Sequence, residues 1–182
     1  MAKQFPALDD SHISFIGAQH IFFTGSAAAE GQVNISPKGM DSLRVLGPNR
    51  IIWRNLTGSG NETAGHLRLA NRITLMWCSF TTRPLILRTY GSAQTIHKGD
   101  ANWDALDSHF TPHISARQIF DVQIDLVQTS CGYAVPFLDN PRERDALTKW
   151  AEDRGEDKIR AYWDEKNRAT IDGYPTGTGT AH

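Results

Sequence analysis

A glycine-rich turn in the first half of the chain has residues suited to binding a negatively charged group. The turn, Gly58-Ser59-Gly60-Asn61-Glu62, connects a β-prone run at 51–56 to a helical pattern and a second β-prone run at 73–80. Backbone N–H groups at a helix start carry a partial positive charge, which favours an anion such as phosphate. Ser59 and Glu62 have the spacing of a capping box, so we expect a helix to begin at this turn.

Two common nucleotide-binding motifs do not fit the turn. No Gly-Lys-Ser/Thr sequence ends it, so it is not a P-loop. The spacing of Gly58, Gly60 and Gly65 is one residue too wide for the dinucleotide fingerprint, and 81–83 reads Thr-Thr-Arg where an acidic residue would meet a ribose hydroxyl. An NADP-type dinucleotide fold is thus a weak alternative, and an ordinary capped helix that binds nothing is a further one.

A second segment, at 31–39, has the alternation of a short strand. Val33 and Ile35 point to one side, while Asn34 and Ser36 point to the other, before a turn that contains Lys38. Its polar face therefore offers an amide, a hydroxyl and an amine. Taken alone, this pattern fits a half-solvated strand. Its value as a candidate site comes from its combination with the later turn.

Four segments together carry a resemblance to a known family. They are VNISPKG at 33–39, RVLGPNRIIWRNLTGSGNETAGHLRLANRITLMWC at 44–78, LILRTYGSA at 85–93 and QTSCGYAVP at 128–136. Over about residues 13–174, the chain resembles the pyridoxamine 5′-phosphate oxidase-like family of FMN-binding split β-barrel proteins. The resemblance implies a mainly β fold with flanking helices, of the α+β class, built on a six-stranded antiparallel split barrel. It also implies a homodimer with two FMN sites at the subunit interface.

The resemblance assigns site residues by position. The side of the isoalloxazine ring and ribityl chain is assigned to Asn34, Ile35, Ser36 and Lys38, and the phosphate side to Thr57, Ser59, Asn61, Glu62 and Thr63. FMN accepts a hydride at N5, and negative charge then grows near N1 and the C2 carbonyl. Lys38 or the backbone N–H groups of its strand are the candidates to stabilise that charge. No acid–base pair is identifiable, so the catalytic residues stay unassigned.

The sequence departs from the pyridoxamine phosphate oxidases proper at both site segments. Those enzymes carry an Arg-x-Val-Leu-Leu-Lys strand and a Ser-Arg-Lys phosphate clamp, whereas here the strand reads Val-Asn-Ile-Ser-Pro-Lys and no Arg or Lys lies between Asn55 and Gly65. We therefore expect a flavoprotein with another substrate range. The first hypothesis is an FMN-dependent oxidoreductase that transfers a hydride between NAD(P)H or a small organic donor and a small-molecule acceptor.

Two other functions stay open at this point. The same barrel could hold deazaflavin F420 or haem in place of FMN. Alternatively, the chain could be a flavin-binding or stress-related module without turnover of its own.

Length, composition and charge are those of a soluble protein. The chain has 182 residues, with 40% hydrophobic and 21% charged, and we expect one domain over 1–171 that includes C-terminal helices. The net charge is −1 with dispersed basic residues, which argues against a nucleic-acid partner. No apolar run approaches the roughly 20 residues of a membrane span, and the start lacks the apolar core of a signal peptide, so a cytoplasmic location is expected. The polar, glycine-rich residues 172–182 indicate a disordered tail.

Periodic patterns predict further elements. Apolar residues alternate with polar ones over 120–126, which indicates a strand with one buried face. Asp100 could cap a helix that buries Trp103, Leu106 and Phe110. Helix-start residues at 140–143 and a helical pattern at about 156–167 predict a pair of C-terminal helices.

Other reactive residues carry weaker hypotheses. His109 and His113 have the spacing of a helical metal pair, but Pro112 lies between them and no third ligand is evident, so no metal is expected. His66 lies one turn into the expected phosphate helix and could approach the cofactor. Cys78 falls in an apolar strand and reads as core, while Cys131 is either a small turn residue or a thiol near the flavin.

Overall fold

The computed structural model describes residues 2–179 of the chain. Within them, eight strands form one sheet, and the pairings between neighbouring strands are antiparallel. In chain order the strands are β1 (Lys3–Phe5), β2 (Phe22–Ser26), β3 (Asn34–Lys38), β4 (Leu43–Gly47), β5 (Arg50–Leu56), β6 (Ile73–Cys78), β7 (Ile86–His97) and β8 (Ala116–Ser130). Their order across the sheet is β3-β2-β6-β7-β8-β5-β4, and β1 pairs with β8.

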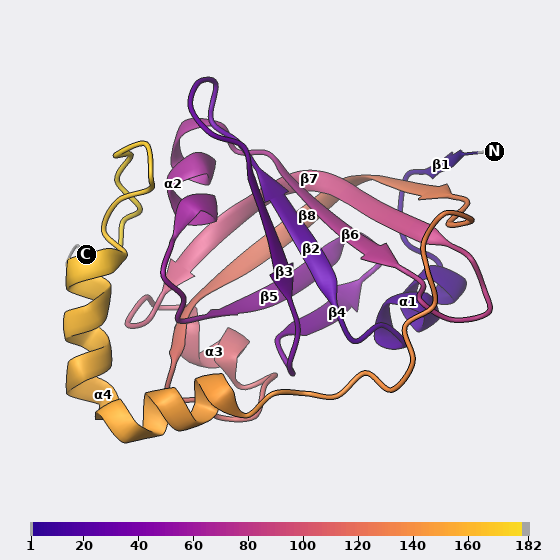
Figure 1. The fold of residues 1–182 in the computed structure, drawn as a ribbon. Helices are drawn as coiled ribbons and strands as arrows, with labels where there is room; N and C mark the ends of the chain where they lie inside the picture. Colours follow the sequence, from indigo (N-terminus) through magenta and orange to yellow (C-terminus); the bar gives the residue numbers. More distant parts are fainter. Residues whose placement is uncertain (1, 180–182) are drawn as a thin grey trace.

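The sheet curls into an open barrel whose path ends at β3 on one side and β4 on the other (Figure 1). This arrangement confirms the expected mainly β, antiparallel split-barrel class, although the sheet has eight strands in the described part of the chain rather than six. The antiparallel pairing also excludes the dinucleotide-binding fold, because that fold requires a mostly parallel sheet.

Four helices in the described residues flank the sheet. They are α1 (Asp10–Gly17), α2 (Glu62–Leu69), α3 (Trp103–Asp107) and α4 (Ala146–Lys166). Figure 1 shows α2 between the barrel and the C-terminal segment, and α4 as a bent helix along the outside of the molecule. No helix within residues 2–179 is long and apolar enough to cross a membrane.

The predicted pair of C-terminal helices is confirmed, but its start is not. Gly155 interrupts α4 with a φ of 72° and a ψ of 166°, which divides it into two helical pieces. The predicted cap at 140–143 is wrong, because helix α4 begins only at Ala146. Asn140 has a φ of 55°, whereas an N-cap residue usually has extended backbone angles.

The hydrophobic core lies on both faces of β5 and β8. Ile51, Ile52 and Trp53 are consecutive residues of β5 and all three are buried, so this strand is covered on two sides. The Trp53 ring stacks on Phe120 of β8 with centroids 4.6 Å apart. Trp53 also lines the candidate site.

Helix α3 closes one end of this core. Trp103, Leu106 and Phe110 are buried on one side of the segment, as the helical spacing predicted. The predicted cap is wrong, because the helix begins at Trp103 and the Asp100 carboxylate instead accepts a hydrogen bond from the backbone N–H of His97 at 2.8 Å.

The alternation predicted over 120–126 holds only up to Ile124. Tyr90 of β7 pairs with Leu126 and Gly91 pairs with Ile124, so Asp125 is an extra residue without a partner on β7. After this bulge the buried residue is Val127, and Leu126 is only half-buried. Gly91 is required at the bulge, because a Cβ there would collide with the carbonyl oxygen of Gln123.

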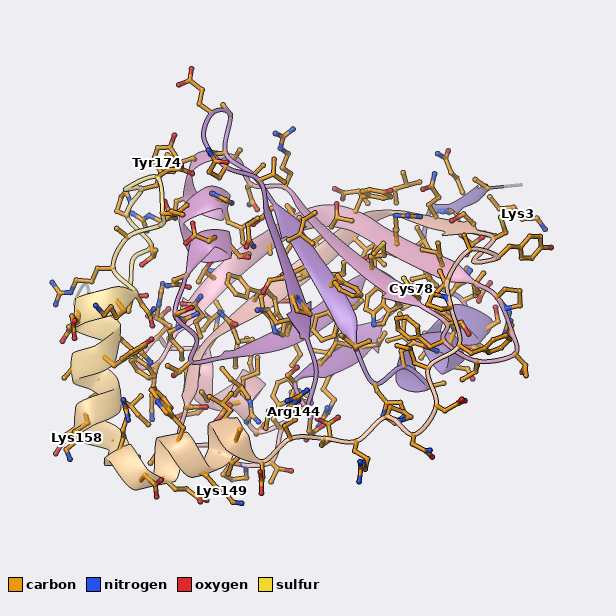
Figure 2. The ribbon with its side chains drawn as sticks, viewed as in Figure 1. Lys3, Cys78, Arg144, Lys149, Lys158 and Tyr174 are labelled. Carbon is orange, nitrogen blue, oxygen red and sulfur yellow. The ribbon has the colours of Figure 1, made fainter. Side chains whose placement is uncertain are left out.

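The prediction of a disordered tail is wrong for residues 172–179. Thr176 is buried, its hydroxyl donates to the carbonyl of Asn167 at 2.6 Å, and its backbone N–H donates to the carbonyl of Arg168. Tyr174 lies beside the loop between β2 and β3, where its hydroxyl donates to the carbonyl of Glu30 at 3.4 Å (Figure 2). Residues 180–182 lie outside the described part of the chain.

Candidate functional site

A polar cavity of about 280 Å³ lies between β3, β5, the turn before α2 and the beginning of β8. It brings together seven of the nine residues predicted for a cofactor site, namely Asn34, Ser36, Lys38, Ser59, Asn61, Glu62 and Thr63. Its other lining residues are Trp53, Asn55, Leu56, Gly58, Gly60 and Arg117. The two separate segments identified in the sequence therefore form one site. We refer to it as the polar cavity.

Strand β3 turns its polar face toward the polar cavity and its apolar face outward. Asn34, Ser36 and Lys38 line the cavity, whereas the side chains of Val33 and Ile35 are 70% and 71% exposed. The predicted alternation is confirmed, but its orientation is the reverse of an ordinary strand with one buried face. The side chain of Ile35, which was assigned to the cofactor, points away from the cavity and lines an apolar groove on the other side of β3.

Lys38 is held at the cavity wall by Ser36 and Trp53. Its Nζ donates to the Ser36 hydroxyl at 2.6 Å and lies 5.3 Å from the centroid of the Trp53 ring. Burial lowers the pKa of Lys38 from the ordinary 10.5 to about 8, and the positive charge of Arg117 acts in the same direction. The amine is therefore charged at neutral pH in a place where its charge is poorly solvated.

Arg117 is placed in the cavity by a β-bulge. Asn55 of β5 pairs with Gln118 of β8 and the next residue, Leu56, pairs with Ala116, so Arg117 has no partner on β5. A bulge of this kind breaks the alternation of a strand and re-aims the side chain of the extra residue. As a result, a guanidinium from the start of β8 reaches the cavity that is lined by β3 and the turn.

The Arg117 guanidinium is buried with part of its hydrogen-bonding capacity unused. Arg117 is 3% exposed, and its Nη1 donates to the carbonyl of Gly60 at 3.2 Å. Its Nε has no partner among the described residues. Burial lowers the pKa of Arg117 to about 10, so the group keeps its charge at neutral pH. Within residues 2–179 neither Arg117 nor Lys38 forms an ion pair with a carboxylate.

The turn begins helix α2 differently from the prediction. The helix begins at Glu62 with Asn61 as its N-cap residue, and Ser59 is exposed before it, so the predicted capping box is wrong. Both carboxylate oxygens of Glu62 accept from the backbone N–H of Ile171, at 3.0 and 3.2 Å. The Asn61 side chain makes no capping hydrogen bond, which leaves the N–H groups of the first turn without a side-chain cap.

Asn61 and Thr57 connect the turn to the C-terminal part of the chain. The Asn61 amide donates to the Thr178 hydroxyl at 2.9 Å and to the carbonyl of Asn167 at 3.2 Å. Thr57, which was assigned to the phosphate side, lies outside the cavity lining. Its hydroxyl donates to the carbonyl of Ser115 and accepts from the indole N–H of Trp163 at 2.8 Å. Both residues hold the turn in place.

Thr63 and Asn34 join the polar cavity to a buried network behind it. The Thr63 hydroxyl accepts from the Asn34 amide and from the Ser26 hydroxyl, both at 3.3 Å. Ser26 in turn lies 3.1 Å from Nδ1 of His66. His66 is therefore behind the cavity wall and does not line the cavity itself.

The remaining reactive side chains lie elsewhere. Cys78 is buried, as predicted, and Cys131 is exposed in the loop after β8. The ring of His113 is engaged with Ser115 and Thr148. No group of three or more His, Cys, Asp or Glu residues in the described part of the chain is arranged to hold a metal ion.

The residues of the cavity that were predicted neither as site residues nor as part of the glycine-rich turn are Trp53, Asn55, Leu56 and Arg117. Trp53, Asn55 and Leu56 belong to the β-prone run at 51–56, and the pattern of that run does not separate a residue that lines a cavity from a residue of the core. Arg117 could have been noticed as a charged residue at the start of a strand with an otherwise buried face. Its direction depends on the bulge, however, and alternation alone does not reveal a bulge.

The donor set of the cavity fits an anion. In the part of the chain that the structure describes, the cavity has two cationic groups without a carboxylate partner, a helix start without a side-chain cap and an Arg117 Nε without a partner. All three favour a ligand that carries negative charge and several acceptor oxygens. A phosphate group combines these two properties.

Comparison with known proteins decides the family. No protein-family model matches the chain. A curated protein from Aspergillus flavus, the pyridoxamine 5′-phosphate oxidase family protein ustO, is 33% identical over 191 residues, which cover 94% of this chain and 76% of that protein. The chain belongs to the pyridoxamine 5′-phosphate oxidase family. This membership confirms the resemblance drawn from the four sequence segments.

Solved structures place the fold in the same group. A Lactobacillus delbrueckii protein named provisionally as a pyridoxamine 5′-phosphate oxidase has a TM-score of 0.55 and 15% identity, covering 68% of this chain and 94% of that one. HupZ from Group A Streptococcus has a TM-score of 0.51 and 17% identity, covering 65% and 91%. The pyridoxamine 5′-phosphate oxidase family member described here thus shares the fold of proteins with very different sequences.

The lowered pKa of Lys38 predicts a pH-dependent response to an inorganic anion. Sulfate, which keeps its charge throughout the neutral and alkaline range, should raise the Tm near neutral pH, and the rise should shrink as the pH passes the Lys38 pKa of about 8. The rise in Tm shrinks at higher pH because a neutral Lys38 amine no longer attracts the anion. Calorimetry at constant ionic strength, with chloride as the reference salt, measures the effect.

The Lys38→Met variant should lose this pH dependence, while Lys158→Met should keep it, because Lys158 points outward from α4 (Figure 2). An identical sulfate response in the parent and the Lys38→Met variant would contradict the placement of the anion.

Proposed function

We propose that this chain is an FMN-binding oxidoreductase in which the polar cavity binds the phosphate of the cofactor. The observation that carries the proposal is the convergence of Lys38 and Arg117 on one small cavity without a carboxylate partner. An unpaired buried charge is costly, so its retention points to a ligand of opposite charge. Family membership supports the assignment of that ligand as FMN.

The chemistry that FMN supplies when bound is the transfer of a hydride at N5. The polar face of β3, with Asn34, Ser36 and Lys38, is the side proposed for the ribityl chain and the ring. Lys38 is positioned at the end of that face and would stabilise negative charge that develops on a ring beside it. Ser59 and Thr63 offer hydroxyls on the phosphate side. The proposed reaction is hydride transfer between NAD(P)H or a small organic donor and a small-molecule acceptor.

The sequence departures at β3 and at the turn argue that the substrate is not a pyridoxamine phosphate. The only basic residues that line the polar cavity within the described chain are Lys38 and Arg117, and both are assigned to the cofactor, Arg117 to its phosphate and Lys38 to the side of its ring. A second phosphate on the substrate would need further cationic side chains. Stress-related flavin binding without turnover is the outcome that remains if no donor reduces the cofactor.

The lining of the cavity favours a flavin over haem. Haem iron is held by His, Cys, Met or Tyr. None of the described residues that line the polar cavity is of these types. Deazaflavin F420 also carries a phosphate, and the visible spectrum distinguishes it from FMN.

A homodimer is proposed on the basis of the outer face of β3. Val33 and Ile35 expose large apolar side chains beside a groove of about 470 Å³, which Phe23, Ile73, Met76 and Tyr90 also line. Strand β3 ends the path of the sheet, and an exposed apolar strand at a sheet end is prone to association unless something covers it. A second copy of the chain would cover this face.

The function is tested by the visible spectrum of the purified protein before and after NADPH is added without oxygen. We expect a stoichiometric FMN spectrum that bleaches on reduction. A flavin spectrum that persists would leave a flavin-binding protein with another donor. A colourless protein that also fails to take up added FMN would reject the cofactor.

Replacing the buried arginine should separate stability from binding. Arg117→Met should weaken FMN binding by roughly tenfold to a hundredfold, because a charge-assisted hydrogen bond to phosphate is lost. The same variant should leave the FMN-free protein as stable as the parent or more stable, since an unpaired buried charge is removed. Fluorescence titration and urea unfolding measure the two quantities.

Arg142→Met is the matched control, because Arg142 is exposed in the loop before α4 and should affect neither quantity. Loss of stability in Arg117→Met, with FMN affinity unchanged, would show that the arginine has a purely structural role.

Charge on the outer face of β3 should dissociate the dimer. A variant with Val33→Lys and Ile35→Lys should sediment as a monomer in analytical ultracentrifugation, whereas the parent sediments as a dimer. Leu69→Lys, at the exposed end of α2, is the control and should leave the mass unchanged. A dimeric double variant would exclude this face from the interface.

A further inference from the structure

We infer that His66 is a positioning residue, which acts through Ser26 to turn the Thr63 hydroxyl proton into the polar cavity. This inference deepens the proposed function and rests on it, because it takes the ligand of the cavity to be the FMN phosphate. Thr63 would then be a phosphate contact whose direction is fixed from behind the cavity wall. Neither the alternation of β3 nor the composition of the turn points to such a relay.

His66 is completely buried and, among residues 2–179, its ring has one side-chain hydrogen-bond partner. It is 0% exposed on helix α2, and its Nδ1 lies 3.1 Å from the Ser26 hydroxyl oxygen. Its Nε2 has no partner among the described residues. In a neutral imidazole one nitrogen carries the proton and the other is an acceptor, so the unpartnered Nε2 limits the choice of tautomer.

A buried N–H without an acceptor is less well tolerated than a buried acceptor without a donor. The favoured tautomer therefore has its proton on Nδ1 and a bare Nε2. In that state the Nδ1–H of His66 donates to the Ser26 hydroxyl oxygen. Ser26 can no longer donate to the ring, and its own proton is directed elsewhere.

The next steps follow from the hydrogen-bonding capacity of each hydroxyl. A hydroxyl has one donor proton and two acceptor lone pairs. Ser26 accepts from His66 and, at 3.5 Å, from the Asn34 amide, and it donates to the Thr63 oxygen at 3.3 Å. Thr63 accepts from Ser26 and from Asn34, so both of its lone pairs are occupied.

Thr63 is therefore left with one unused group, its own proton. Because Thr63 lines the polar cavity, that proton is available to a ligand there. Together with the Lys38 amine and the Arg117 guanidinium, it gives the cavity three donor groups, while both oxygens of the Glu62 carboxylate in the lining accept from the backbone N–H of Ile171. A fully ionised phosphate accepts at every oxygen and fits such a set, whereas a ligand with its own hydroxyl protons would leave one donor facing another.

The inference is tested by a double-mutant cycle on FMN affinity. Thr63→Val should weaken FMN binding about tenfold or more, the effect expected when a hydrogen bond to a charged group is lost. His66→Leu, which keeps the volume of the ring, should have a similar effect. The double variant should bind no more weakly than Thr63→Val alone, because both changes remove the same hydrogen bond.

If His66→Leu does not fold, Ser26→Ala takes its place, since it breaks the relay at its middle residue. Thr89→Val is the matched control. It also removes a buried threonine hydroxyl, one that has no partner in the described part of the chain and does not line the cavity, so FMN affinity should be unchanged. The inference would be overturned if the losses of FMN affinity caused by Thr63→Val and by His66→Leu (or Ser26→Ala) multiply in the double variant.

A second measurement does not depend on FMN. Nitrogen-15 NMR of histidine-labelled protein, with the His66 signals assigned by comparison with His66→Leu, should show the proton on Nδ1. A proton on Nε2 would overturn the relay whatever the affinity data show. If the parent protein does not bind FMN, the proposed function is rejected. The tautomer of His66 would still show whether the hydrogen bonds of the buried network run from His66 to Thr63.

Discussion

The constraint on which the site depends is the burial of two like charges beside one another. Burial lowers the pKa values of Lys38 and Arg117 to about 8 and about 10, and no carboxylate in the described part of the chain pairs with either group. Such an arrangement destabilises the protein in the absence of a ligand, and an anion between the two cations reverses the penalty. The residues that bind the ligand thus lower the stability of the ligand-free protein.

The rest of the fold holds these charges in position from three directions. Strand β3 presents its polar face inward, the bulge in β8 directs Arg117 to the same place, and Trp53, whose ring stacks on Phe120, forms part of the cavity wall. The C-terminal segment fixes the turn from the outside, through Asn61, Glu62 and the carbonyl of Gly58, which accepts from Asn167 at 3.1 Å. A turn secured at both ends gives the first helical N–H groups a fixed direction, as an anion site requires.

The sequence identified those parts of the site that depend on local pattern. Strands β5 and β6 follow from the β-prone runs at 51–56 and 73–80, and seven of the nine residues predicted on β3 and the turn line one cavity. The misses share one cause, which is contact between distant segments. The capping box failed because the Glu62 carboxylate bonds to Ile171, 109 residues away. Arg117 was missed because a bulge changes its direction. Polar composition indicated a disordered tail, but Thr176 and Thr178 find buried partners on the body of the protein.

The most direct test of this account is a crystal structure of the protein grown with FMN. The account predicts the phosphate in the polar cavity, within hydrogen-bonding distance of Arg117 and Thr63, with the ring on the side of β3 and Lys38. A flavin bound elsewhere, with Lys38 and Arg117 still facing an unfilled cavity, would contradict the claim that these two charges bind the cofactor.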